Sequence, residues 1–267
     1  MRNRFPAKAI ALSIHLAFCS GTVLANPSGA QVANGQVAFA QPNSTSLQVT
    51  NSPGAVINWQ SFSIAPGEIT RFIQQSAAST VLNRVVGQNL SQIYGTLQSN
   101  GRVFLVNPNG ILVGPGAVID TAGFIASSLR MTDADFLAGK LRFAGDAGSG
   151  AVVNQGRIRT GFGGTVALIA PSVENSGLIE TPGGGILLAA GQKVQIASIE
   201  HGDVLFEVQA PTDSVVNLGQ LLADGGAVGA FAGTLKHSGE IRANALIRDA
   251  GGQIVLAGQK DVELAAG

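Results

Sequence analysis

The chain has 267 residues, of which 36 are Gly and one is Cys, and its 16 basic residues balance its 16 acidic ones. Charged residues make up only 12% of the chain, against a usual ~25% in globular proteins. This low and balanced charge excludes a basic nucleic-acid-binding protein and an acidic disordered tail. Hydrophobic residues, at 45%, suffice for a core, and the many small uncharged residues favour stacked strands with tight turns.

The first 25 residues have the pattern of a secretory signal peptide. Three basic residues precede the apolar run Ala9–Phe18, which is too short to span a bilayer. Val23–Ala25 predicts cleavage after Ala25. Cys19 raises the alternative of a lipoprotein signal, although Phe18 is too bulky for the residue before a lipid-attachment cysteine. Cleavage would leave a net charge of about −3 and no cysteine for a disulfide.

A repeat of about 21 residues marks the C-terminal half of the chain. Asn154–Ile158 recurs as Asn175–Ile179, then after 42 positions, interpreted as two periods, as Asn217–Leu221, and after a further 20 as His237–Ile241. A second mark follows each of these segments: Gly163-Gly164, Gly184-Gly185, Gly225-Gly226 and Gly251-Gly252. Self-similarity at this spacing predicts a solenoid.

The length and pattern of the repeat predict an all-β fold, a parallel β-helix. A coil of about 21 residues has room for three short strands and three turns, and within it apolar and polar residues alternate, as at Arg157–Arg159. The Gly pairs are expected to supply positive φ at the corners. The side chains predicted to stack in one inward column are Ile158, Ile179, Leu221 and Ile241. Residues after the leader would form about eleven coils and a rod of ~50 Å.

Three segments depart from this repeat. Met131–Leu141 has a capping-box pattern and predicts a short helix with Phe136, Leu137 and Leu141 on one face. The repeat is degenerate near Val204–Val208, which is either a coil strand or half of an extra hairpin. Asn26–Gln98 has weak periodicity, and we expect it to cap the exposed strand edges at the start of the β-helix.

The most informative motif lies in Gly101–Gly114, where two apolar strands flank Asn107-Pro108-Asn109-Gly110. Pro fixes φ for the second position of a turn, and Asn-Gly tolerates left-handed backbone, so the pattern alone predicts a tight β-turn.

This segment, together with Val81–Gly87 and Ser91–Leu97, resembles the secretion domain of two-partner secretion exoproteins of the filamentous-haemagglutinin type, also called the haemagglutination activity domain. The resemblance covers Gln36–Arg142. Gly54–Ile64 is similar to the family's Asn-Trp-x-x-Phe strand pair. The segments Phe136–Gly139 and Phe143 are similar to the region after the family motif.

The resemblance implies a right-handed parallel β-helix with an N-terminal β cap. It divides the chain into a signal peptide (1–25), a secretion domain with the cap and first coils (26–145) and continuing β-helix repeats (146–267). It also implies export by the general secretory translocon, cleavage by signal peptidase and delivery to an outer-membrane β-barrel transporter. The POTRA domains of that transporter would bind the secretion domain while it is extended. The product would be secreted to the surface of a Gram-negative bacterium through the periplasm.

The family's Asn-Pro-Asn-Gly-Ile motif maps onto Asn107, Pro108, Asn109, Gly110 and Ile111, which are the predicted partner-binding residues. A second family motif, Asn-Pro-Asn-Leu, is missing. Gly87–Leu90 stands near its place and keeps only Asn89 and Leu90, so the role of these two residues, included in the predicted site, is open.

The sequence predicts no enzyme, no cofactor and no metal site. Cys/His metal spacing and a complete phosphate-binding loop are absent, and acidic residues are scattered. Of the two histidines after the leader, His237 takes the place of Asn in the repeat and is expected at a turn. Trp59 and Tyr94 could stack on a sugar, although packing in the cap explains them better.

Two functions are therefore compatible with the sequence. The first is a secretion and folding-nucleation module of an adhesin, haemagglutinin or cytolysin, whose downstream regions would contact a host cell surface or carbohydrate. The second is a stand-alone β-helix that binds or cleaves carbohydrate. The chain ends at Ala265–Gly267 without an evident closing cap, which favours the N-terminal portion of a longer exoprotein or a truncated relative. No nucleic-acid partner is expected.

Overall fold

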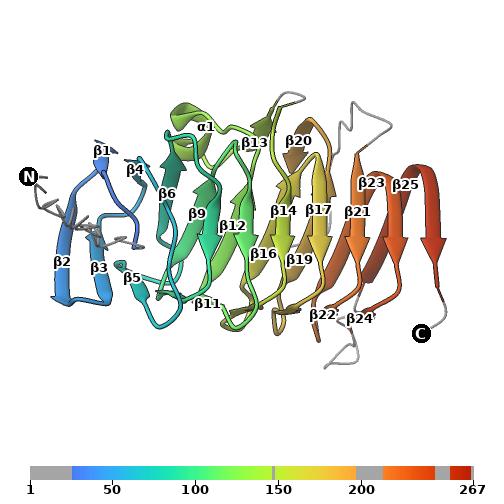
Figure 1. Cartoon of the computed structure of the whole chain (residues 1–267). Coiled ribbons are helices and arrows are strands. Elements are labelled where there is room, and N and C mark those ends of the chain that lie inside the picture. The colour runs from blue at the N-terminus through green and yellow to red at the C-terminus, as the bar shows by residue number, and fades with distance from the viewer. Residues whose placement is uncertain (1–25, 146–147, 197–212, 244–252, 266–267) are drawn as a thin grey trace, which may run out of the picture.

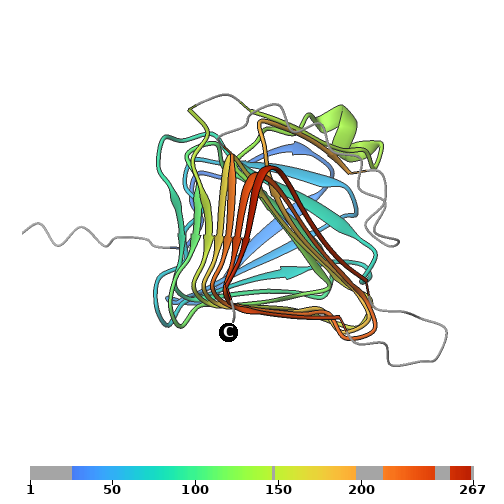
Figure 2. The same cartoon turned by 90° about the vertical axis from the view of Figure 1, so that its right-hand side faces the viewer.

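The computed structural model describes residues 26–145, 148–196, 213–243 and 253–265. The predicted leader and the ambiguous segment Val204–Val208 lie outside these residues. The chain winds into coils that stack along one axis (Figure 1). Viewed along that axis, the coils superpose as a three-sided outline (Figure 2). The strand-and-turn coil predicted from the repeat is therefore the unit of the fold.

Parallel strands line each face of the outline; the strands of the first and second faces are joined through β23 (Ala227–His237) into one 14-stranded sheet, and the third face belongs to a 9-stranded sheet. The first face contains β4 (Ala55–Trp59), β6 (Thr80–Val85), β9 (Arg102–Val106), β12 (Gly123–Ser127), β16 (Thr165–Ala170) and β19 (Gly185–Ala190). The second contains β7 (Ser91–Ile93), β10 (Ile111–Val113), β14 (Val152–Asn154), β17 (Ser172–Asn175) and β21 (Ser214–Asn217). The third contains β3 (Ser46–Asn51), β5 (Ile69–Ile73), β8 (Thr96–Ser99), β11 (Val118–Thr121), β15 (Arg157–Thr160), β18 (Leu178–Glu180), β22 (Gln220–Leu222) and β24 (Glu240–Arg242). The long strands β23 and β25 (Gln253–Leu264) run across the first and second faces.

The predicted inward column is confirmed. Ile158 pairs in register with Ile179, Ile179 with Leu221, and Leu221 with Ile241. The first three side chains are fully buried, and Ile241 packs against the same core from its edge. Alternation along the third-face strands therefore places one member of this column from each coil inside the solenoid, where stacking removes it from water.

The interpretation of the 42-residue interval as two periods is wrong. Asn175 and Asn217 are direct neighbours on adjacent strands of the second face. The interval is one coil with an insertion, because β20 (Lys193–Ile196) leaves the coil and pairs antiparallel with β13 (Leu141–Ala144). The estimate of eleven coils is too high, because eight strands stack in parallel on the third face of the described chain. The cap strands, the segment of α1 (Asp133–Leu137) and β13, and the insertion after β19 each use residues that the estimate counted as coils.

The N-terminal cap is present but shorter than predicted. β1 (Gln31–Asn34) pairs antiparallel with β4, and β2 (Val37–Asn43) pairs antiparallel with β3. These two strands cover the edges of the first coil. Parallel stacking already begins with β3 and β5, so much of Asn26–Gln98 belongs to the coils and not to the cap.

The predicted helix is also shorter than expected. α1 spans Asp133–Leu137, and the Thr132 side chain accepts a hydrogen bond from the Asp135 N–H as its N-cap. Phe136 is buried and packs edge-on against Phe104 at 5.2 Å between ring centroids. Leu137 is 52% exposed, and Leu141 lies in β13, so the predicted common helix face is wrong. No helix in the described part of the chain is long and apolar enough to cross a membrane.

A second apolar cluster lies outside the coils. Outward side chains of the first face, including Leu82, Phe104 and Ile125, are buried beneath α1, β13 and β20. Figure 2 shows α1 outside the three-sided outline. The first face is therefore apolar on both sides, which explains its nearly continuous burial from β4 to β19.

Candidate functional site

The motif Asn107–Gly110 forms the corner between β9 of the first face and β10 of the second. The Gly110 N–H donates to the Asn107 carbonyl at 2.9 Å, which closes a β-turn. The Asn107 Oδ1 accepts from the Asn109 N–H at 3.0 Å, so an Asx-turn reinforces it. Gly110 has a φ of 106°, which other residues rarely adopt. The sequence prediction of a tight turn is confirmed.

The Asn107 side chain is fully buried and joins this corner to the preceding coil. Its Nδ2 donates to the Asn89 carbonyl and to the Ser91 Oγ, both at 2.9 Å. Its Oδ1 is already used by Asn109. Every polar group of the Asn107 amide is thus satisfied inside the protein, as a buried amide requires.

Asn109 also links the motif corner to the preceding coil. Its Nδ2 donates to the Gly87 carbonyl at 2.9 Å and to the Asn107 Oδ1 at 3.1 Å. The segment Gly87–Leu90 therefore forms the corner directly beneath the motif. Asn89 contributes its backbone carbonyl while its side chain is exposed, and Leu90 is 37% exposed. The structure brings all seven predicted site residues together at adjacent corners.

The following coil closes over the motif. The Gly150 N–H donates to the Pro108 carbonyl at 2.8 Å, and the Ile111 N–H donates to the Ala151 carbonyl at 3.0 Å. Ile111 is fully buried in the core. The motif corner is thus held between the coil before it and the coil after it.

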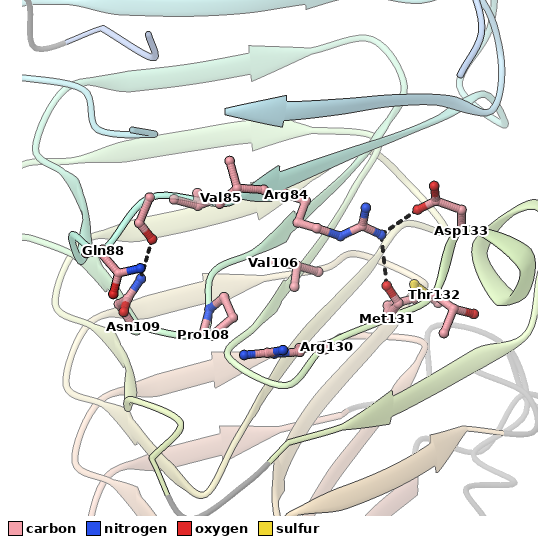
Figure 3. A pocket seen from close by; sticks show the side chains of 12 residues that line it. Arg84, Val85, Gln88, Val106, Pro108, Asn109, Arg130, Met131, Thr132 and Asp133 are labelled. Atoms are coloured by element: carbon pink, nitrogen blue, oxygen red, sulfur yellow. Dashed lines mark hydrogen bonds and ion pairs between the residues drawn. The ribbon is translucent and has the colours of Figure 1, made fainter. Parts of the chain in front are cut away.

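A cavity of about 580 Å³ lies between this corner and the segment leading into α1 (Figure 3). Asn109 and Pro108 line one side of it, and Arg84 donates from the other side to the Met131 carbonyl at 2.9 Å and to Asp133 at 2.6 Å. The sequence gives no signal for this contact, because Arg84 and Asp133 are 49 positions apart and no spacing pattern links them. The capping-box pattern accounts for the position of Asp135 at the start of the helix, but it assigns no role to Asp133.

The candidate sugar-stacking residue Trp59 ends β4 of the first face and packs against the cap. It is 1% exposed, stacks edge-on with Phe39 and Phe62, and donates from its Nε1 to the buried Asn83 at 2.9 Å. It therefore presents no face to a sugar. Tyr94 is half-buried and lies over Gly114.

His237 ends β23 immediately before a turn, where its Nδ1 lies 3.0 Å from the Asn217 Nδ2. It thus occupies the Asn position of the repeat, as the sequence predicts. Within the described ranges, His, Cys, Asp and Glu side chains form no group of three suited to a metal ion.

Comparison with known proteins connects this geometry to a family. A model of the TPS secretion domain matches residues 24–266. A heme/hemopexin-binding protein of Haemophilus influenzae Rd is 31% identical over 174 residues, which are 62% of this chain and 19% of that protein. A second Haemophilus influenzae heme/hemopexin-binding protein is 35% identical over 120 residues, 43% of this chain and 13% of that protein. The chain thus matches less than a fifth of the length of these relatives.

Two solved structures share the fold. The HMW1 secretion domain from Haemophilus influenzae superposes with a TM-score of 0.83 at 37% identity, covering 86% of this chain and 62% of that one. The filamentous hemagglutinin secretion domain superposes with a TM-score of 0.52 at 17% identity, covering 90% and 99%. The predicted right-handed parallel β-helix with an N-terminal cap is confirmed.

TPS secretion domains belong to two-partner secretion exoproteins, which Gram-negative bacteria secrete with the help of an outer-membrane transporter. The family match extends well beyond Gln36–Arg142, the part that the sequence motifs single out. With its stacked coils, antiparallel cap and corner motif in place, the chain belongs to the family of TPS secretion domains.

Proposed function

We propose that this chain carries the secretion signal of an exoprotein and is bound, while extended, by the POTRA domains of a partner outer-membrane β-barrel. The proposed route begins at the general secretory translocon, and signal peptidase removes residues 1–25 after Ala25. The bound segment includes Asn107–Ile111 and Asn89-Leu90. The exported chain itself is proposed to be a non-catalytic module.

The observation that carries this proposal is the burial of Asn107. Both ends of its amide are bonded within the folded protein, to Asn89, Ser91 and Asn109. A partner that recognised the Asn107 side chain in the folded state would have to break those hydrogen bonds in a site closed to water. The same amide is free in an extended chain, so recognition before folding is the physically accessible order.

The strands beside the motif suit such recognition. β9 is apolar over Val103–Val106, and Ile111 and Val113 alternate with Leu112 in β10. An extended segment of this kind can add as a strand to an exposed sheet edge, where main-chain hydrogen bonds give affinity and alternate side chains give register.

Folding outside the cell would then favour outward transport. Each new coil adds a parallel strand to each of the three faces and buries a further member of the column Leu97, Ile119 and Ile158. A folded coil cannot return through a pore that passes only an extended chain. The proposed cargo is an adhesin, haemagglutinin or cytolysin, whose other regions contact host surfaces or carbohydrate.

Secretion of three variants in cells with and without the partner barrel tests the proposal. Asn107→Ala and Asn109→Ala should abolish extracellular protein while leaving the leader cleaved and the chain in the periplasm. Asn175→Ala is the matched control, because Asn175 is also a fully buried corner amide bonded to neighbouring coils but lies outside the motif. Equal losses for Asn107→Ala and Asn175→Ala would mean that folding, and not recognition, fails.

A binding measurement separates these outcomes without any folding step. A peptide of residues 80–115 is expected to bind the isolated POTRA domains, and its Asn107→Ala form to bind at least tenfold more weakly. Identical affinities for the two peptides would contradict recognition of the extended motif.

A further inference from the structure

Three asparagines and one histidine form a column of side chains at the end of the second face. The column consists of Asn154, Asn175, Asn217 and His237, which pair in register on β14, β17, β21 and β23. The Asn154 Nδ2 donates to the Asn175 Oδ1 at 2.7 Å, and the Asn175 Nδ2 donates to the Asn217 Oδ1 at 2.9 Å. The asparagines are buried and His237 is half-buried.

Backbone groups fix which end of each side-chain amide in this column donates and which end accepts. The Gly156 N–H points at the Asn154 Oδ1 at 3.2 Å, so this oxygen must accept. The Asn175 Nδ2 lies 3.4 Å from the Gly177 carbonyl, which can only accept. Reversing the amides would place donor against donor at the first contact and acceptor against acceptor at the second.

This direction determines the state of the histidine. The Asn217 Oδ1 is occupied by Asn175, so Asn217 presents its Nδ2 to the His237 Nδ1, 3.0 Å away. The ring nitrogen must therefore accept, which requires an uncharged imidazole with its proton on Nε2. A protonated ring carries N–H at both nitrogens and would oppose the Asn217 donor.

We propose that His237 is a proton-sensitive end of the amide column, which holds the last coils together when uncharged and releases them when protonated. Histidine is the side chain whose charge ordinarily changes between about pH 5 and 8. Because the folded state uses the uncharged ring, acid weakens the contact between β21 and β23. An asparagine at the same position would continue the column at any pH.

The charged groups around His237 have partners of their own. Lys236 and Glu263 pair at 3.2 Å between β23 and β25. From β24, Glu240 accepts from Gln220 at 2.8 Å and lies 3.8 Å from the Arg242 guanidinium.

The other described residues that pair or bond with His237 from β25 and its C-terminal end are uncharged. β25 places Leu264 opposite it in register, and the Ala265 N–H donates to the His237 carbonyl at 2.9 Å. No acidic side chain in the described residues forms an ion pair with the imidazole. A positive charge there has no counterion in the described structure to offset the broken hydrogen bond.

Two measurements on the folded protein test this proposal. Nitrogen-15 NMR of the wild-type imidazole at pH 7.5 should show the Nε2–H tautomer. Hydrogen exchange, corrected for intrinsic rates, should show amide protection in residues 227–242 falling about tenfold between pH 7.5 and 5.0, the scale of one lost buried hydrogen bond. Protection in residues 157–180, far from the end of the column, should stay constant.

Two variants complete the test. His237→Asn should abolish the pH dependence and keep the pH 7.5 protection, whereas His201→Asn, which removes the other histidine after the leader, should leave the pH dependence intact. An Nδ1–H tautomer at pH 7.5, or the same tenfold loss in His237→Asn, would overturn the proposal.

Discussion

The Asn175 Nδ2 donates to the Asn217 Oδ1 at 2.9 Å, although 42 residues separate them in the chain. Asn175 accepts in turn from Asn154, which lies 21 residues earlier. The two intervals differ twofold in length but correspond to the same single step along the axis. Corner amides, more than strand length, therefore mark the register of this β-helix, because each must meet the next to satisfy its buried polar groups.

Asn175→Ala should destabilise the protein by about 1–3 kcal/mol, because it leaves the Asn154 Nδ2 and the Asn217 Oδ1 buried without this partner. Urea unfolding of the variant against wild type measures the effect. Ser172→Ala is the control, since Ser172 lies on the same strand with an exposed side chain. An equal midpoint for Asn175→Ala and Ser172→Ala would contradict a structural role for the column.

The sequence predicts the inward column correctly because every member is apolar and sits between polar neighbours, as at Ile158 and Ile179. The repeat spacing predicts one coil too many at 193–213, because an insertion of nearly one coil length there has the same length as a repeat with a degenerate sequence. The motif turn at Asn107 is equally local and is predicted well. Its bonds to Asn89 and Ser91, and the Arg84–Asp133 contact, join segments whose proximity depends on coil stacking, which no local pattern records.

Gly177→Ala should destabilise the protein by about 1–3 kcal/mol, because the added methyl group would overlap the Gly156 carbonyl of the coil below. Two backbones meet here, and neither is free to move apart without breaking the sheets on either side. Thermal and urea unfolding measure the loss. Gly161→Ala is a matched control, because a Cβ at Gly161 meets nothing within 4 Å. Comparable losses at the two positions would contradict the steric explanation.

Thr160→Val should leave stability unchanged or raise it by about 1 kcal/mol. The Thr160 Oγ1 is buried and has no hydrogen-bond partner in the described structure, so the hydroxyl is desolvated without compensation. Valine keeps the branched shape. Thr70→Val is the contrasting variant, because the fully buried Thr70 donates to the Asn26 Oδ1 at 3.0 Å and should lose stability. A clear loss for Thr160→Val would reveal a partner for its hydroxyl.

Asp213→Asn should stabilise the protein at pH 7. The Asp213 side chain is 3% exposed and its Oδ2 has no hydrogen-bond partner among the described residues, so burial raises its pKa above the ordinary 3.8. A carboxyl whose folded pKa exceeds its unfolded pKa binds its proton more tightly in the folded state. The penalty for ionising it is therefore absent below the unfolded pKa, grows as pH rises through the folded pKa and persists above it.

The gain from Asp213→Asn should accordingly be largest at pH 7 and shrink as the pH is lowered toward 4, which urea midpoints at a series of pH values would show. Asp120→Asn is the control of opposite sign, because Asp120 is partly exposed and accepts from Arg159 at 2.6 Å. It should lose up to about 1 kcal/mol at pH 7, the scale of a surface ion pair. If Asp213→Asn lowers stability at pH 7, the ionised carboxylate has a stabilising partner, and the direction argued from burial is wrong.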